Sequence, residues 1–463
     1  MFYSTNLPIA ASFFCKVCYL SFLVLPYTAN AAELSLSQVQ QLAIENDPWL
    51  AGNRLQEQAL IASSDAAATL PDPLISVGLA NLPTDTFRFN QEPMTQFKVG
   101  LSQQLSRGDS LSLKRQQMRQ QAAQHPYLRQ DRQAKIKVMV AELWLTMVST
   151  QQRIKIIEQS RPLFLQLVEI VEAHYSSAQG STRQQDIVNA QLELARLEDR
   201  LSASIADRAT NLAKLSQWLY TGVQLNSQWI DMDMPDYNRA WPSLPTLEPA
   251  IEHLLRQQDR SALAQRLAQH PAILAIEQQI KVSRSAIQIA QQQYQPQWAV
   301  NASYALRDND PLGNDRADFF SIGVSVDIPF FTAQKQDKAL LASRLQAESV
   351  KTDKLLALRS LLAQLQSTWQ TFDSINQRIE HYETKILPQM AEQSEAALTA
   401  YTTDDGNFSD VMRANIAQLN TELELIQLHT AHALSLVQLD YYFNDAAAST
   451  DRINNAQNRG EQP

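Results

Sequence analysis

The chain has 463 residues, a formal net charge of −9 at pH 7 and only ten glycines. The negative charge excludes a typical nucleic-acid-binding protein, which would present a basic surface. Few glycines beside many Gln, Ala and Leu residues indicate long helices. After the first 31 residues, no apolar run reaches the roughly 18 residues that a membrane-spanning helix needs.

Residues 1–31 have the pattern of a secretory signal peptide. Their apolar stretch ends in LVLPYTANAA, and residues 29–31 (ANA) fit the small-x-small cleavage rule. A buried core helix is the alternative interpretation. Both cysteines, Cys15 and Cys18, lie in this leader, so we expect a mature chain without a disulfide or a thiolate metal site.

Residues 32–220 are predicted to form a first structural repeat. The pattern predicts, in chain order, a helical run over 34–69, strands at about 74–82 and 96–105, and a helical hairpin over 107–220. The hairpin consists of a long helix over 107–175, a glycine-containing turn and a returning helix over 184–220.

The same layout returns in residues 261–445, which are predicted to form a second repeat. Its expected elements are a helical run over 262–294, strands at about 297–306 and 319–328, and a hairpin with helices over 332–400 and 408–443. Residues 221–260, rich in Pro, Trp and Asp, join the repeats and are predicted to be an irregular equatorial segment. The tail, 446–463, is predicted to be disordered.

Landmark residues support an internal duplication because they recur at nearly constant spacing. The spacing is 223 residues from Pro48 to Pro271 and from Gly100 to Gly323, and 226 residues from Pro162 to Pro388 and from Tyr175 to Tyr401. The two turns, HYSSAQGSTRQQD and AYTTDDGNFSD, are therefore interpreted as one turn made twice.

The predicted strands alternate apolar residues with small or polar ones. In 319–328, for example, Phe320, Ile322 and Val324 oppose Ser321 and Gly323. Each segment has about the ten residues that a tilted strand needs to cross a bilayer. A half-buried sheet in a soluble domain would show the same alternation, so the strands alone leave both possibilities open.

The helical runs favour the membrane interpretation. Each long run covers roughly 70 residues and would extend about 100 Å, more than a compact soluble domain needs. An apolar stripe with steps of three and four indicates a coiled-coil-like seam, formed by Leu358, Leu362, Leu365, Trp369, Phe372, Ile379 and Ile386. We expect Pro126, Pro162 and Pro388 to kink or break the helices.

Four strands cannot close a barrel, and an open sheet edge in lipid leaves backbone groups unpaired. Several copies of the chain would have to share one barrel. Three copies would supply twelve strands continued by a ring of helices, which is the layout of a conduit.

The sequence resembles the TolC family of outer-membrane efflux proteins over about residues 34–443. The resemblance rests on the two-fold repeat, the strand pairs, the turns, and the opening motif formed by Ala43, Asn46 and Pro48. LPDPLISVGLANLPTD (70–85) and SRGDSLSLKRQQM (106–118) resemble the branch that serves heavy-metal efflux pumps of the RND type.

The resemblance implies a mainly α fold with transmembrane β structure. Each protomer would add four strands to a trimeric twelve-stranded outer-membrane β-barrel and its hairpins to a long antiparallel α-helical barrel in the periplasm. It further implies outer-membrane localisation, contact with outer-membrane lipid, a periplasmic adaptor (membrane fusion) protein, an inner-membrane RND-type transporter, and passive conduction of heavy-metal cations. An outer-membrane conduit for drugs or for type I protein secretion is the alternative.

Family members close their periplasmic end with acidic rings at the first turn of the returning helices. By motif, these positions are Asp186 and Asp410, and Asp404 and Asp405 lie close to the second turn. Such rings would attract cations. Asp186 and Asp410 could instead only cap their helices, and the other two could belong to a solvated loop. Arg413 stands where some members have a second aspartate, and the first turn is longer than the second.

The turns are also the expected adaptor-docking tips, marked by Gly180, Gly406, Tyr175 and Tyr401. Glycine permits left-handed backbone there, and the small neighbouring residues would admit another helical hairpin. An ordinary turn without a docking role is the alternative.

Nothing in the sequence predicts an enzyme or a cofactor. Phosphate loops and hydrolase or zinc-protease motifs are absent. His429 and His432 stand three apart on a helix, but no third ligand is evident, so we interpret them as surface or packed residues. A soluble periplasmic coiled-coil adaptor or scaffold remains the second alternative, although an adaptor would carry one hairpin and glycine-rich β-domains.

Overall fold

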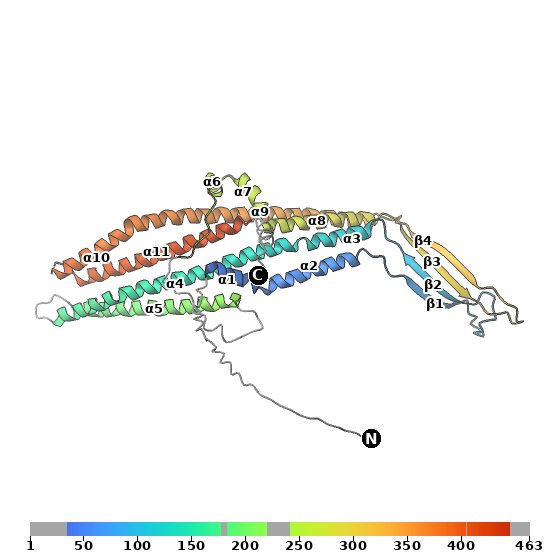
Figure 1. The fold of residues 1–463 in the computed structure, drawn as a ribbon, viewed down its shortest axis with the longest axis horizontal. Coiled ribbons are helices and arrows are strands. Elements are labelled where there is room, and N and C mark those ends of the chain that lie inside the picture. The colour runs from blue at the N-terminus through green and yellow to red at the C-terminus, as the bar shows by residue number, and fades with distance from the viewer. Residues whose placement is uncertain (1–34, 177–182, 220–240, 404, 445–463) are drawn as a thin grey trace, which may run out of the picture.

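The computed structural model describes residues 35–176, 183–219, 241–403 and 405–444. The predicted signal peptide, the predicted tail, Gly180 and Asp404 lie outside the described residues. Figure 1 shows an elongated molecule with a sheet at one end and two helical hairpins that reach the other end.

The first half contains two short helices, two strands and a hairpin. Their bounds are α1 Leu36–Glu45, α2 Pro48–Ala66, β1 Leu74–Ala80, β2 Gln96–Gln104, α3 Ser110–Ala122, α4 His125–Ser176 and α5 Gln184–Leu219. The 52 residues of α4 extend about 80 Å.

The second half repeats this order after two connecting helices. Its elements are α6 Pro249–Gln257, α7 Arg260–Leu267, α8 Pro271–Gln292, β3 Gln297–Leu306, β4 Phe319–Asp327, α9 Gln336–His381, the π-helical turn η2 Tyr382–Ile386, α10 Leu387–Thr402 and α11 Phe408–Tyr442. In Figure 1, α6 and α7 lie against the middle of α9.

Two equivalent helices begin at the same chemical signal, an N-cap residue followed by proline. Asp47 accepts a hydrogen bond from the Trp49 N–H ahead of α2, and His270 accepts one from the Ala272 N–H ahead of α8. Proline suits the first helical position because its missing N–H would have no helical partner there.

The strands form one antiparallel sheet in the order β1-β2-β3-β4 within the described residues. The register aligns Val77, Val99, Tyr304 and Phe320 in one row across the sheet and Ser76, Gly100, Ser303 and Ser321 in the next. Because neighbouring rows point to opposite faces, the sheet has one apolar face and one face of small and polar residues.

The apolar face of this sheet is not covered by the other described parts of the chain. Its exposed side chains include Ile75, Val77, Leu101, Tyr304, Phe320, Ile322 and Val324. In the described part of the chain, β1 and β4 each pair with only one neighbour. The apolar face and both edges are therefore open in the described chain.

Apolar clusters hold the helices together along the length of the molecule. Near the middle, α6 and α7 pack Ile251, Leu255 and Leu263 against Leu365 and Trp369 of α9. The predicted stripe on α9 is thus partly covered by α6 and α7. The expectation that all of 221–260 is irregular was wrong for α6, whose apolar residues at 251, 254 and 255 form one helical face.

The three prolines behave differently from one another. The helix is interrupted just before Pro126, between Ala122 and His125. At Pro162, where a kink or a break was expected, α4 continues without a break. Ile157 and Phe164 are buried on either side of this proline and hold the helix in place. Ahead of Pro388 the helix changes to the π-turn η2.

None of the helices in the described ranges combines the length and the apolar character that a membrane-spanning helix requires.

Candidate functional site

The helices that adjoin the two hairpin turns pack against each other at the end of the molecule opposite the sheet (Figure 1). One apolar cluster joins all four helices there. It includes Phe164 and Val171 of α4, Leu197 of α5, and Val411 and Leu419 of α11. The cluster fixes how the first turns of α5 and α11, which carry the predicted acidic residues, lie relative to each other.

Tyr401 lies inside this cluster with only 6% of its surface exposed. The Tyr401 ring centroid lies 5.4 Å from the His174 ring centroid. It lies 5.6 Å from the Phe408 ring centroid, and these two rings meet edge to face. Tyr401 therefore supports the second turn from within and offers little surface to a partner. Tyr175, the matching residue by sequence, is 51% exposed and remains accessible.

Gly406 closes the second turn at short range. Its backbone φ is not positive, so the turn does not use the left-handed backbone that glycine permits. Glycine is needed for close approach instead, since a Cβ atom at 406 would lie 2.9 Å from the Tyr401 backbone nitrogen and 3.0 Å from the Ala400 carbonyl carbon. The Asp405 N–H donates to the Ala400 carbonyl at 2.9 Å and completes the turn.

Replacing Gly406 with Ala is expected to destabilise the turn by about 1–3 kcal/mol, because backbone atoms must move to admit the methyl group. Hydrogen exchange of residues 400–412 measures the effect. Gly52→Ala is the matched control, since a Cβ there meets nothing within 4 Å and Ala favours the helix. Equal exchange in both variants would contradict the prediction.

Asp186 and Asp410 occupy the third position of their helices, α5 and α11. The Asp186 carboxylate accepts a hydrogen bond from the Arg183 backbone N–H at 2.9 Å, and the Asp186 N–H donates to the Arg183 carbonyl. This reciprocal pair caps α5. Asp186 therefore caps its helix, as the alternative interpretation of the sequence predicts. An additional role of Asp186 at a gate remains a prediction.

Asp410 makes no such cap. Its Oδ1 atom lies 3.1 Å from Nη1 of Arg413, one turn later on the same helix face, and both side chains are largely exposed. Arg413 thus lowers the net negative charge that the second tip presents. Asp405 is also exposed, so the described part of residues 401–413 carries two carboxylates and one guanidinium.

Arg413→Ala is expected to strengthen the binding of cations at this end by about two- to fivefold, as an exposed neighbouring charge is removed. Asp410→Ala is expected to weaken cation binding. Block of single-channel current by added divalent cations measures both. The same block in Arg413→Ala, Asp410→Ala and the parent protein would rule out a role for this pair in the predicted constriction.

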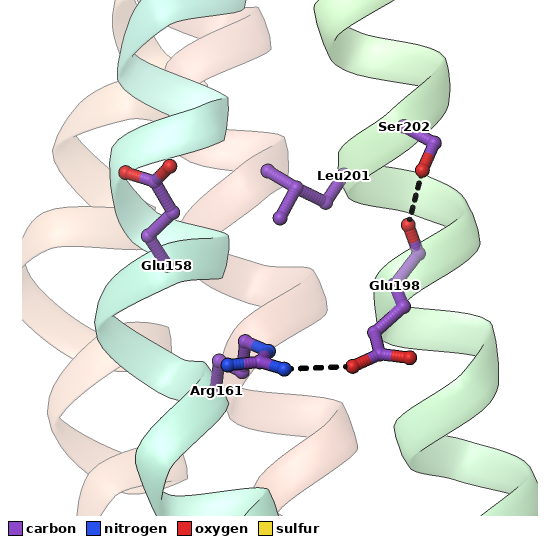
Figure 2. Close-up of a pocket in the computed structure, with 5 residues that line it drawn as sticks. All are labelled: Glu158, Arg161, Glu198, Leu201 and Ser202. Carbon is purple, nitrogen blue, oxygen red and sulfur yellow. Dashed lines mark hydrogen bonds and ion pairs between the residues drawn. The ribbon is translucent and has the colours of Figure 1, made fainter.

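An open groove runs between α4 and α5 in the first hairpin. Figure 2 shows Glu158 and Arg161 on α4 facing Glu198, Leu201 and Ser202 on α5. Arg161 Nη2 lies 2.9 Å from Glu198 Oε1, and the Ser202 hydroxyl donates to the Glu198 carbonyl at 3.0 Å. The groove is polar and open to solvent. Small-molecule sites are enclosed and mostly apolar, so the groove does not have the character of such a site.

The histidine pair predicted on the returning helix is split between two partners. His429 Nε2 lies 3.2 Å from Glu383 Oε1, while the His432 ring stacks on Phe372 with centroids 4.7 Å apart. Within the described ranges, no three His, Cys, Asp or Glu side chains are grouped to hold a metal ion.

Sequence reasoning missed two features of this region. The Asp410–Arg413 pair has a readable signal, because opposite charges three apart on a helix are neighbours. The Glu383–His429 pair joins residues 46 positions apart in the chain, and no spacing rule indicates it.

No protein-family model matches the chain, and no curated protein matches its sequence. Solved structures do match. The structure of CusC, studied for the conformational changes that accompany its folding and transmembrane channel formation, gives a TM-score of 0.69 at 16% identity and covers 89% of this chain and 92% of CusC.

Two further structures resemble the chain to the same degree. The outer membrane protein VceC of Vibrio cholerae gives a TM-score of 0.68 at 13% identity, over 88% of this chain and 96% of VceC. The outer membrane channel CmeC of Campylobacter jejuni gives 0.68 at 13% identity, over 97% of each chain.

The fold of this chain is therefore that of bacterial outer-membrane channels. More particularly, it is the fold of the TolC-family efflux channels, to which these structures belong. At 13–16% identity the likeness concerns the fold, and it confirms the predicted class of long antiparallel helices with four strands per chain.

Proposed function

We propose that three copies of this chain form the outer-membrane channel of a tripartite efflux system, with the helices extending into the periplasm. The observation that carries the proposal is the sheet, which exposes an apolar face and leaves both edges unpaired within the described chain. In hydrocarbon, only a closed ring of strands satisfies the backbone. The likeness to solved outer-membrane channels supports this proposal.

In this arrangement each copy adds β1 to β4 to a twelve-stranded β-barrel. The apolar face turns toward lipid, and the face with Ser76, Gly100, Ser303 and Ser321 lines a wet interior. Conduction is passive, since the chain offers a path and the energy comes from its partners. We propose no enzymatic activity and no cofactor.

The partners that we propose are a periplasmic adaptor protein and an inner-membrane RND-type transporter. The adaptor would meet the hairpin tips, where Tyr175 and Asp405 are exposed and Gly406 keeps the second turn compact. Buried Tyr401 would support that surface without touching the adaptor.

Heavy-metal cations are the cargo that we propose. Support comes from the resemblance of residues 70–85 and 106–118 to the heavy-metal branch and from the likeness to CusC. The acidic side chains near the tips are compatible with cations. Drugs or exported proteins are the competing cargo classes.

Fractionation and conduction test the channel. We expect the protein in outer-membrane fractions as a trimer that heat dissociates in detergent, and we expect stepwise ion currents in planar bilayers. Recovery as a monomer in the soluble periplasm, without such currents, would instead favour the coiled-coil adaptor or scaffold.

Deletion of the gene tests the cargo separately. Greater sensitivity to metal ions than to drugs supports the metal proposal, and the reverse replaces it with a drug conduit. Because the channel test does not depend on the cargo, failure of one proposal leaves the other open to its own test.

A further inference from the structure

Two connecting segments pass between the sheet and the helices at the centre of the strand order. Residues 105–109 lead from β2 into α3, and residues 293–296 lead from α8 into β3. Because β2 pairs with β3 and α3 packs beside α8, the two segments lie next to each other (Figure 1). We call this pair of segments the junction. It is the place where the first repeat meets the second between the sheet and the helices.

Arg107 is the charged side chain at the centre of the junction, and it is only 13% exposed. Its Nη1 donates to the Gln295 carbonyl at 2.9 Å and to the Gln293 carbonyl at 3.5 Å. Its Nη2 donates to Gln297 Oε1 at 3.3 Å and forms an ion pair with the Asp327 carboxylate. One guanidinium of the first repeat thus contacts the end of α8, the start of β3 and the end of β4 in the second repeat.

A guanidinium suits this place because of how α8 ends. The carbonyls of residues 290–292 accept hydrogen bonds from the N–H groups of residues 293–295. The carbonyls of Gln293 and Gln295 come next and receive the Arg107 donors. They lie near the negative end of the helix dipole, where a cation is favoured. The planar guanidinium also directs several donors at once, so it serves carbonyl and carboxylate oxygens together.

The residues after Arg107 fit closely against the end of α8. Gly108 has a positive φ of 51°, which other residues rarely adopt. The Asp109 N–H donates to Oε1 of Gln292, the last residue of α8, at 3.0 Å. A Cβ atom at 108 would collide with this same oxygen. Glycine therefore allows both the turn into α3 and the contact between the start of α3 and the end of α8.

The hydrogen bonds of the sheet end just before Arg107. The Leu105 N–H donates to the Trp298 carbonyl at 2.8 Å, and Gln297 Nε2 donates to the Leu105 carbonyl at 3.2 Å. Helix packing between α3 and α8 begins a few residues later. The contacts of Arg107 therefore connect the two repeats over the short stretch that neither sheet pairing nor helix packing covers.

Arg107 has no counterpart in the second repeat. The spacing of 223 residues that relates Gly100 to Gly323 places Phe330 at the equivalent position, and Phe330 is 79% exposed. Phe330 follows β4, which is an edge strand of the sheet within the described chain. The polar contacts are thus made at the centre of each copy, between its own two repeats.

We propose that Arg107 is a positioning residue that fixes the direction in which the sheet leaves the helices. A rotation of the sheet against α3 and α8 would break several of its hydrogen bonds together, because they reach both sides of the junction. These contacts act within one copy and do not require the proposed function. An effect on conduction, by keeping the barrel in line with the helices, would rest on that function.

Hydrogen exchange of the purified full-length protein measures the loss of these contacts. In Arg107→Met, we expect the amides of residues 109 and 293–295 to exchange about three- to tenfold faster, the range for charged hydrogen bonds with partly exposed partners. The amides of residues 400–412, at the far end of the molecule, should keep their rates. Arg107→Lys retains the charge without the fork and should give an intermediate increase.

Spin labels measure the direction of the sheet, which a general loss of stability does not report. One label replaces Ser321 on β4 and the other replaces Gln288 on α8, and both positions are exposed. Labelled chains are diluted with unlabelled chains, so that the measured distance lies within one copy. We expect a broader distribution of this distance in Arg107→Met than in the parent protein.

Two further variants complete the test. Arg115→Met breaks an exposed pair between α3 and Asp65 of α2, away from the junction, and should leave both readouts unchanged. Asp327→Asn removes only one partner of Arg107, so it should show a smaller effect and serves if Arg107→Met does not assemble.

Three outcomes would overturn the proposal: equal effects in Arg107→Met and Arg115→Met, faster exchange along the whole chain in Arg107→Met, or an unchanged distance distribution in that variant. If Arg107→Met does not assemble, unchanged exchange and distances in Asp327→Asn overturn it. Absence of ion currents would count against the proposed channel alone, because the labels report on a single copy.

Discussion

Arginine in place of Ile322 is expected to prevent the chain from assembling in the outer membrane, while arginine in place of Ser321 is expected to be tolerated. Ile322 lies near the middle of β4, is 72% exposed, and shares a row with Ile75, Leu101 and Ala302. A cation on the lipid face near the bilayer midplane costs about 2–4 kcal/mol per copy, and the cost is paid three times in a trimer.

The measurement is the amount of heat-sensitive trimer in outer-membrane fractions. Ser321 is the matched control because it neighbours Ile322 but belongs to the row of Gly100 and Ser303 on the opposite face. Normal assembly of Ile322→Arg, or an equal defect in both variants, would contradict the proposed orientation of the sheet.

The second large effect is expected at Arg132, which neutralises a buried carboxylate. Arg132 Nε lies 2.8 Å from Oδ2 of Asp47, whose side chain is only 3% exposed. The guanidinium carbon also lies 5.9 Å from the Trp49 ring centroid and 5.8 Å from that of Trp218. Arg132→Met leaves the carboxylate buried and unpaired, which should destabilise the fold by about 3 kcal/mol.

Thermal unfolding followed by circular dichroism measures this loss. Asp47→Asn in the Arg132→Met background should restore part of the stability, because an amide can still accept the hydrogen bond from the Trp49 N–H. Arg161→Met is the matched control, since its pair with Glu198 is about half exposed and is worth less than about 1 kcal/mol. Equal losses at Arg132 and Arg161 would contradict the prediction.

The strands could be read from the sequence because their signal is local. Alternation with a period of two needs only the order of residues, and β3 has the predicted bounds of 297–306 while β4 ends one residue before the predicted 328. The returning helices, α5 and α11, likewise begin at the predicted 184 and 408. Local patterns thus located most of the elements.

The differences arise where tertiary packing overrides local chemistry. Pro162 does not interrupt α4, because apolar side chains on both sides of it are buried against the second hairpin. Composition suggested an irregular segment over 221–260. Residues 249–257 of this segment nevertheless form the helix α6, because its apolar face packs against the apolar stripe of α9. Tyr401 looked like a surface marker, but the helices next to the turns bury it.

The acidic residues of the tips show the same limit. Sequence placed Asp186 and Asp410 at equivalent helix positions, and the structure agrees. Their partners differ, since Asp186 binds a backbone N–H and Asp410 binds Arg413. Matching positions in the two halves of the chain therefore need not have the same partners.

The number of strands in each chain has a consequence for how copies can join. Strands β1 and β3 run in one direction and β2 and β4 in the other. Since the number of strands is even, β4 of one copy would run antiparallel to β1 of the next copy. Each junction between copies in the proposed ring would then have the same antiparallel hydrogen-bonding pattern as the sheet within one copy. Because this parity holds for any number of copies, the direction of strand pairing alone does not determine how many copies form the ring.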